Sequence, residues 1–123
     1  MIETDILRIL VDKLVAEKEE AILILILRLM NILLEGDMAT SLFLATPVLQ
    51  RLNSHLVSRN WEIRKFSAEN LGSISYNVAG KSSTIEAESI KPLCEMLADE
   101  IYEVRASAVR ALASLAQLKE GKI

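Results

Sequence analysis

The stretch WEIRKFSAENLGSISYNVAGK, residues 61–81, recurs in altered form as YEVRASAVRALASLAQLKEGK, residues 102–122. At an offset of 41 residues, Trp61 falls on Tyr102, and E-I-R falls on E-V-R. The same offset extends upstream, superposing Leu49 on Ile90, Leu52 on Leu93 and Leu56 on Leu97. Self-similarity with a period of this length is the sequence signature of repeat proteins. We therefore expect stacked copies of one structural unit.

A third copy precedes these two and includes EEAILILILRLMNILLEGD, residues 19–37. At an offset of 42 residues, three leucines of the second copy, Leu49, Leu52 and Leu56, fall on Leu7, Leu10 and Leu14. Carried onward, this register predicts that Leu29 and Ile32 are core positions. The apolar run 21–34, whose one charge is Arg28, is too short for a membrane span, because its 14 residues reach about 21 Å as a helix, against a hydrocarbon core of about 30 Å.

Apolar spacing in each copy is helical, and it predicts a short, a medium and a long helix per unit. Short helices are expected near 41–45 and 83–88, and medium helices near 4–16, 47–57 and 90–98. Long helices are expected near 19–35, 60–77 and 100–118. Asn60 and Asp99 are predicted to cap long helices, and Ser83 with Glu86 has the spacing of a capping box.

Composition narrows the classes of function. The net charge is −3, which gives no basic face for nucleic acid. The single His55 and the single Cys94 have no spacing that would pair them, and no phosphate loop or metal-ligand cluster is present, so no cofactor or metal is expected. Cys94 is read as a small core residue. An enzyme with a site built across repeats is the remote alternative.

The segment GKSSTIEAESIKPLCEMLADEIYEVRASAVRALASLA, residues 80–116, resembles an armadillo repeat, and the Asp99 and Arg105 pair resembles the ladder of HEAT repeats. The resemblance implies an all-α, right-handed armadillo/HEAT-like α-solenoid of about three repeats. We place the repeats at about 1–38, 39–80 and 81–123 within one domain, and expect the chain to be part of a longer array. Arg64 and Arg105 are expected to tie neighbouring units together.

A closer resemblance concerns EIRKFSAENLGSISYNVAGKSSTIEAESIKPL, residues 62–93. This stretch is similar to the C-terminal repeats of the armadillo proteins of the radial spoke head of motile cilia. The resemblance implies a non-enzymatic scaffold in axonemal assembly, located in the cytoplasm, including the ciliary axoneme. The alternative is a general peptide-binding armadillo adaptor in the cytoplasm or nucleus.

Armadillo arrays present their long helices on a concave surface, where an asparagine on each helix holds an extended peptide in import receptors and catenins. The matching positions here are Asn31, Ser73 and Ser114, and the tryptophans of import receptors are absent. A receptor for nuclear localisation signals is therefore not expected. The candidate partner-binding residues are Asn31, Glu69, Ser73, Tyr76, Asn77, Arg110, Ser114 and Gln117. The alternative is that these polar side chains are merely solvated.

The predicted first helix, DILRILVDKLV at residues 5–15, carries a wide apolar stripe. Terminal repeats normally have a polar outer face. Each exposed Leu or Ile withdrawn from water contributes about 1.5–3 kcal/mol. We therefore expect the isolated chain to self-associate through this helix.

Overall fold

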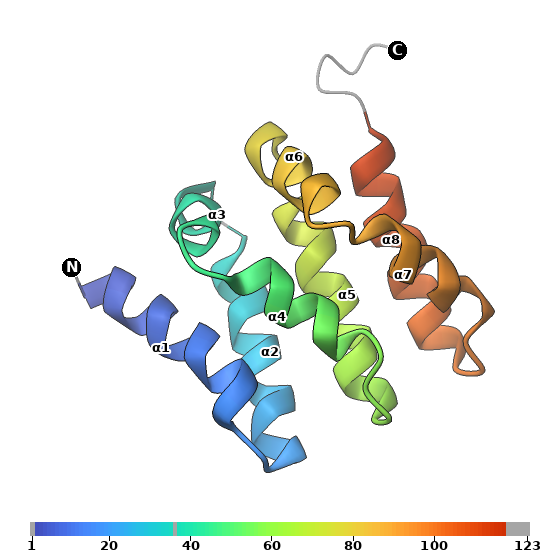
Figure 1. The fold of residues 1–123 in the computed structure, drawn as a ribbon, viewed down its shortest axis with the longest axis horizontal. Helices are drawn as coiled ribbons and strands as arrows, with labels where there is room; N and C mark the ends of the chain where they lie inside the picture. Colours follow the sequence, from blue (N-terminus) through green and yellow to red (C-terminus); the bar gives the residue numbers. More distant parts are fainter. Residues whose placement is uncertain (1, 36, 118–123) are drawn as a thin grey trace.

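The computed structural model describes residues 2–35 and 37–117, and within these ranges all of its regular secondary structure is helical (Figure 1). Leu118, the last residue of the predicted third long helix, lies outside them. The elements are α1 (Ile2–Ala16), α2 (Glu20–Leu33), α3 (Asp37–Leu44), α4 (Val48–His55), α5 (Trp61–Ile74), α6 (Val78–Glu86), α7 (Ile90–Glu95), the short 3₁₀ helix η1 (Met96–Ala98) and α8 (Tyr102–Ala116).

The helices form two layers of a solenoid (Figure 1). The long helices α2, α5 and α8 lie side by side, and α5 packs extensively against both others. The medium helices α1, α4 and α7 form the second layer, while α3 and α6 lie along one edge of the stack. Consecutive units therefore present equivalent helices on the same side of the molecule.

The core is aliphatic and continuous through the stack. Each medium helix buries leucine against the long helix of its own unit, and Phe43 of α3 is completely buried. Fully buried core members from the three units include Val11, Leu27, Leu52, Leu71, Leu93 and Val104. Burial of such side chains contributes about 1.5–3 kcal/mol each, which is the main force holding the units together.

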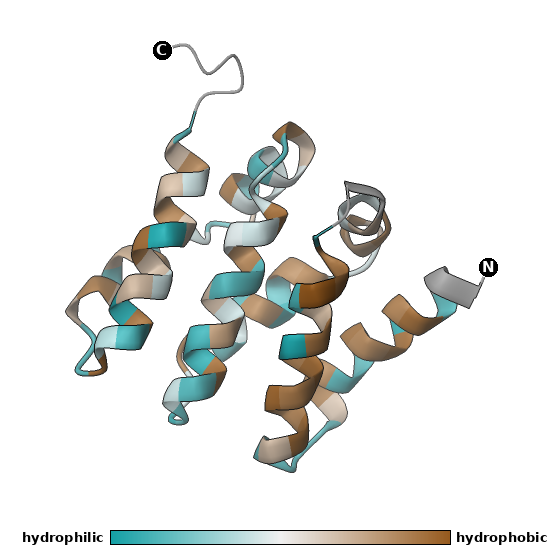
Figure 2. Ribbon diagram, turned by 180° about the vertical axis from the view of Figure 1, so that it is seen from behind, coloured by the Kyte–Doolittle hydropathy of each residue, from teal (hydrophilic) through white to brown (hydrophobic). Residues whose placement is uncertain are grey.

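The predicted core positions on α2 are wrong. Leu29 is 42% exposed and Ile32 is 63% exposed, whereas Leu27 and Met30 are fully buried. The cause is the register, because α2, α5 and α8 begin at residues 20, 61 and 102, which are 41 residues apart in both steps. The offset of 42 holds for the leucines of the medium helices and does not carry into α2. The hydrophobic pattern of α2 does not indicate which face is buried, because most of the helix is hydrophobic (Figure 2).

The helix caps agree only in part with the prediction. Asn60 caps α5, its side-chain oxygen accepting a hydrogen bond from the Glu62 amide at 2.9 Å. Asp99 precedes the cap of α8 by two residues and accepts from the Ile101 amide at 3.0 Å. The proposed capping residue Ser83 lies inside α6.

The true start of α6 is set by Asn77, whose side chain accepts from the Gly80 amide at 2.7 Å. A Cβ at Gly80 would lie 1.7 Å from the backbone oxygen of Ile74, so this close crossing requires glycine. Both short helices begin earlier than predicted, α3 at Asp37 and α6 at Val78. The sequence pattern missed the start of α6 because Asn77 provides a cap without the Ser-x-x-Glu spacing.

The prediction that Arg64 ties neighbouring units together is confirmed, whereas the same prediction for Arg105 is wrong because its bond lies within one unit. Arg64 pairs with both oxygens of Asp99 at 2.8 and 3.0 Å and donates to the Ser58 carbonyl at 2.9 Å. Arg105 donates to the Asp99 carbonyl at 2.6 Å. Burial raises the pKa of Asp99, but the hydrogen bonds from Arg64 and Ile101 and the two guanidinium charges outweigh it, so the net pKa is lowered from 3.8.

The residues that carry potential chemistry are dispersed. Cys94 is exposed, so the prediction of a core position is wrong. His55 lies with Nε2 2.6 Å from the carbonyl oxygen of Leu14, which links α4 to α1. Among the described residues, no group of three or more His, Cys, Asp or Glu side chains is arranged to hold a metal ion. No described helix combines the length and apolar character needed to span a membrane.

Candidate functional site

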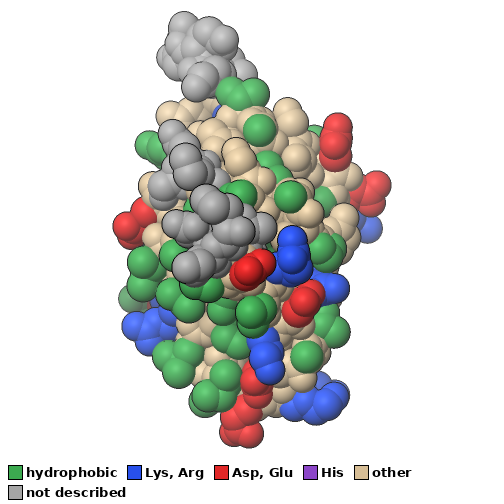
Figure 3. All heavy atoms as spheres, turned by 90° about the vertical axis from the view of Figure 1, so that its left-hand side faces the viewer, with side chains coloured by type: hydrophobic (Ala, Val, Ile, Leu, Met, Phe, Trp, Pro, Cys, Tyr) green, Lys and Arg blue, Asp and Glu red, His purple; other side chains and the backbone are tan. Residues whose placement is uncertain are grey.

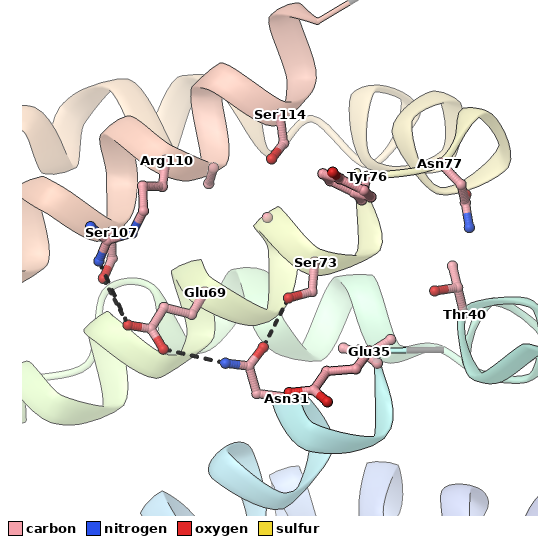
Figure 4. A pocket seen from close by; sticks show the side chains of 13 residues that line it. Asn31, Glu35, Thr40, Glu69, Ser73, Tyr76, Asn77, Ser107, Arg110 and Ser114 are labelled. Atoms are coloured by element: carbon pink, nitrogen blue, oxygen red, sulfur yellow. Dashed lines mark hydrogen bonds and ion pairs between the residues drawn. The ribbon is translucent and has the colours of Figure 1, made fainter. Parts of the chain in front are cut away.

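A groove crosses the layer of long helices and encloses a cavity of about 520 Å³ (Figure 4). Its floor comes from α2, α5 and α8, and residues from the starts of α3 and α6 border one end. Such a volume lies within the usual range for ligand sites. The lining residues are Asn31, Leu34, Glu35, Thr40, Glu69, Gly72, Ser73, Tyr76, Asn77, Ser107, Arg110, Ala111 and Ser114.

A hydrogen-bond network centred on Glu69 joins the three helices (Figure 4). Glu69 Oε1 accepts from Asn31 Nδ2 at 3.3 Å, and Oε2 accepts from Ser107 Oγ at 3.2 Å. Asn31 Oδ1 in turn accepts from Ser73 Oγ at 2.9 Å. One carboxylate on the middle helix therefore orders side chains from both neighbouring helices.

Two cations flank the same carboxylate. Lys65 Nζ lies 3.6 Å from Glu69 Oε2, and Arg110 Nη2 lies 4.0 Å from it. The Lys65 ammonium also stands 4.3 Å from the centre of the Phe66 ring, a cation–π position. The Arg110 side chain is 66% exposed, in contrast to 21% for Glu69. Lys65 is thus held from two sides, while Arg110 extends into solvent at the groove.

Small residues bring the middle and last helices together under the groove. A Cβ at Gly72 would lie 3.2 Å from the Ala111 Cα, so glycine permits the close approach of α5 and α8. On the other side of α5, buried Asn70 donates from Nδ2 to the Leu27 carbonyl at 3.1 Å and to the Phe66 carbonyl at 2.9 Å. These contacts fix the spacing of the three helices and therefore the width of the groove.

Most of the predicted site residues come together here. The groove is lined by Asn31, Glu69, Ser73, Tyr76, Asn77, Arg110 and Ser114. Gln117 caps the end of α8 and is not among the lining residues; its carbonyl accepts a hydrogen bond from Lys81. Sequence reasoning missed Ser107, Thr40 and Glu35. Ser107 precedes Ser114 by two helical turns on one face, a spacing that could have identified it.

Comparison with solved structures defines the class of the protein. An engineered protein superposes with a TM-score of 0.85 and 24% identity, over 90% of this chain and 45% of its own. A designed armadillo repeat protein superposes with a TM-score of 0.82 and 22% identity, over 93% of this chain and 48% of its own. A second designed armadillo repeat protein, in complex with the peptide (KR)4, superposes with a TM-score of 0.84 and 22% identity, over 93% of this chain and 48% of its own. The fold is therefore a right-handed armadillo/HEAT-like α-solenoid.

Within that class, one repeat is recognised from sequence, because residues 90–118 match the HEAT repeat family. The match covers α7, η1 and α8. The chain spans under half the length of the solved structures that it resembles. A search of curated proteins found no match.

Proposed function

We propose that this protein is an interaction scaffold that binds an extended segment of another protein across α2, α5 and α8. The observation that carries the proposal is the continuous groove in which polar side chains from three successive units converge on Glu69. The designed armadillo neighbour in complex with the peptide (KR)4 supports this use of the fold.

The dimensions of the groove favour an extended segment. Packed helices lie about 8–10 Å apart, so three neighbouring helices span about 16–20 Å. An extended chain rises about 3.3 Å per residue, so about five or six residues would cross the groove. Tyr76 is 79% exposed at its border, and Tyr and Arg are the side chains that most often anchor interfaces. Asn31, Ser73 and Ser114 offer hydrogen bonds to such a segment.

A peptide-display selection against the intact chain, followed by a titration of amide proton–nitrogen spectra, tests the proposal. We expect selected peptides to shift the amide signals of α2, α5 and α8 around the groove and to leave those of α4 and α7 in place. The triple variant Glu69→Gln, Tyr76→Ala, Arg110→Gln should lose this binding. Binding that survives the triple change, or shifts confined to the medium helices, would refute the concave groove as the site.

The more specific role that we propose is assembly of a ciliary radial spoke complex in the cytoplasm and axoneme. It rests on the likeness of residues 62–93 to radial-spoke-head armadillo repeats. The alternative remains a general peptide adaptor of the cytoplasm or nucleus. Co-purification of the full-length protein from ciliated cells separates them, since recovery of spoke components supports the first and their absence favours the second.

We also propose that the isolated chain self-associates through its α1–α2 end. Ile6, Ile9, Leu25 and Leu29 are between 42% and 57% exposed there. Figure 3 shows hydrophobic side chains among charged ones on this end of the solenoid. Adding 41 to the residue numbers of the exposed stripe of α2 gives the equivalent positions on α5. Those positions lie on the face of α5 that packs against α2. A second copy of the chain would cover it in the same manner.

Sedimentation velocity over a range of concentrations tests the proposed self-association. We expect the mean mass to rise with concentration, and the double variant Ile9→Glu, Leu25→Glu to remain a monomer. The matched control is Val57→Glu, which alters an exposed apolar side chain after α4. A wild-type chain that stays monomeric at every concentration would refute self-association.

A further inference from the structure

We propose that the groove selects a segment carrying an aspartate or glutamate side chain, which docks against Arg110 on α8. The inference rests on the proposed function of the groove and specifies the chemistry of its partner. It also sets this chain apart from the designed armadillo neighbour in complex with the basic peptide (KR)4.

The first step in the argument is that Glu69 is already engaged. Its Oε1 accepts from Asn31, and its Oε2 accepts from Ser107 and lies 3.6 Å from the Lys65 ammonium. A lysine or arginine from a partner would have to displace these donors to reach the carboxylate. A carboxylate offers a limited number of acceptor positions, and here both oxygens have partners within the protein. The groove is therefore poorly suited to a basic side chain at its centre.

The second step is that Arg110 has unused donor capacity. Its guanidinium carries five N–H groups, yet it donates no hydrogen bond to the part of the chain that the structure describes. Its nearest anion is Glu69 at 4.0 Å, and the side chain is 66% exposed. Ser114 lines the groove one helical turn further along α8. A carboxylate beside Arg110 could thus accept from the guanidinium and from the Ser114 hydroxyl.

The third step is the local balance of charge. Lys65 and Arg110 place two positive charges around the single negative charge of Glu69. The other lining carboxylate, Glu35, lies on the α2 side of the groove, whereas Arg110 lies on α8 (Figure 4). The cluster of Lys65, Glu69 and Arg110 therefore has one more positive than negative charge, although the chain as a whole carries −3. Charge complementarity of this kind selects partners and orients them.

Three labelled peptides of about six residues, the length that crosses the groove, provide the test. They alternate Ser with Glu, with Gln or with Lys, and their affinity for the intact chain is measured by fluorescence anisotropy. We expect the Glu peptide to bind about fivefold more tightly than the Gln peptide and more tightly than the Lys peptide. Raising the salt concentration should reduce the difference.

Two variants of the protein test whether Arg110 is responsible for the tighter binding of the Glu peptide. Arg110→Gln should abolish the advantage of the Glu peptide, while Arg59→Gln, the same substitution at an exposed arginine outside the groove, should preserve it. Equal thermal melting of both variants and the wild type will show that folding is unaffected. Tighter binding of the Lys peptide, or an advantage of the Glu peptide that survives Arg110→Gln, would overturn the acidic preference and leave the groove intact. Failure of all three peptides and of every display-selected peptide would overturn the proposed function itself.

Discussion

Truncation of Leu27 and Leu29 to alanine, one at a time, tests the register of the first unit. The two residues lie two positions apart on α2 and have identical side chains, but Leu27 is fully buried and Leu29 is 42% exposed. Replacing a fully buried leucine by alanine costs about 2–5 kcal/mol, because transfer free energy is lost and a cavity remains. For Leu29 we expect a loss below about 1 kcal/mol, since much of the side chain is already in water.

The difference is large relative to the stability of a small domain, which is about 5–15 kcal/mol. Urea denaturation followed by far-ultraviolet circular dichroism should give Leu27→Ala a clearly lower midpoint, and Leu29→Ala a midpoint close to that of the wild type. A loss of about 3 kcal/mol would also lower the melting temperature by roughly 10 °C or more for a chain of this size. Fluorescence of Trp61 in α5 reports separately on the middle unit.

Protein concentration must be varied in both experiments, because Leu29 also lies on the proposed self-association face. Any effect of Leu29→Ala that fades on dilution belongs to association and not to the core. Equal destabilisation of the two variants at low concentration would refute the 41-residue register of α2. It would restore Leu29 to the interior of the unit.

Four further predictions concern contacts within the stack. Gly80→Ala should destabilise the chain by about 2 kcal/mol or more in thermal melting, because the new Cβ would overlap the Ile74 carbonyl; an unchanged melting temperature would refute that crossing. Asn70→Asp should cost about 3 kcal/mol in urea denaturation, because a buried carboxylate would face two carbonyl oxygens in place of an amide donor; a cost no larger than that of a surface change would contradict the buried hydrogen bonds. Arg64→Ala should cost about 2 kcal/mol at neutral pH. Because the pKa of Asp99 is lowered in the folded state, the ionised carboxylate stabilises the fold above pH 3.8, and this stabilisation is lost as the pH falls through the folded pKa. Asp99→Asn should therefore flatten the acid part of a plot of urea midpoint against pH. An unchanged slope would contradict the pairing of Asp99 with Arg64.

The sequence predicted the class of fold because the repeat itself carries the information. Two copies that share aromatic, arginine and leucine positions at one spacing require equivalent helices in equivalent places. The interunit role of Arg64 followed from the same reasoning, since a repeated arginine beside an acidic residue suits pairing between neighbours. Polar residues at matching positions of α5 and α8, such as Ser73 and Ser114, also predicted side chains that line the groove.

The predictions from sequence were wrong where the pattern of hydrophobic and polar residues was ambiguous. The apolar run of α2 fits more than one register, so the face carrying Leu29 could not be distinguished from the face carrying Leu27. The start of α6 depends on the Asn77 cap and on a close backbone crossing at Gly80, which no periodicity reveals. Ser107 was missed although it shares a helical face with Ser114, and its contact with Glu69 in the neighbouring unit shows that it belongs to the groove.

The polar contacts between units, among residues 2–35 and 37–117, connect only neighbours along the stack. Arg51 of α4 donates to the Val11 carbonyl of α1, Asn70 joins α5 to α2, and Arg64 joins α5 to the approach of α8. Extensive helix contacts follow the same rule, with none between α1 or α2 and α7 or α8 in the described chain. If the solenoid were pulled from its two ends, the full force would act on every interface between neighbouring units. The molecule would stretch as a spring does, and it would give way first at its weakest joint.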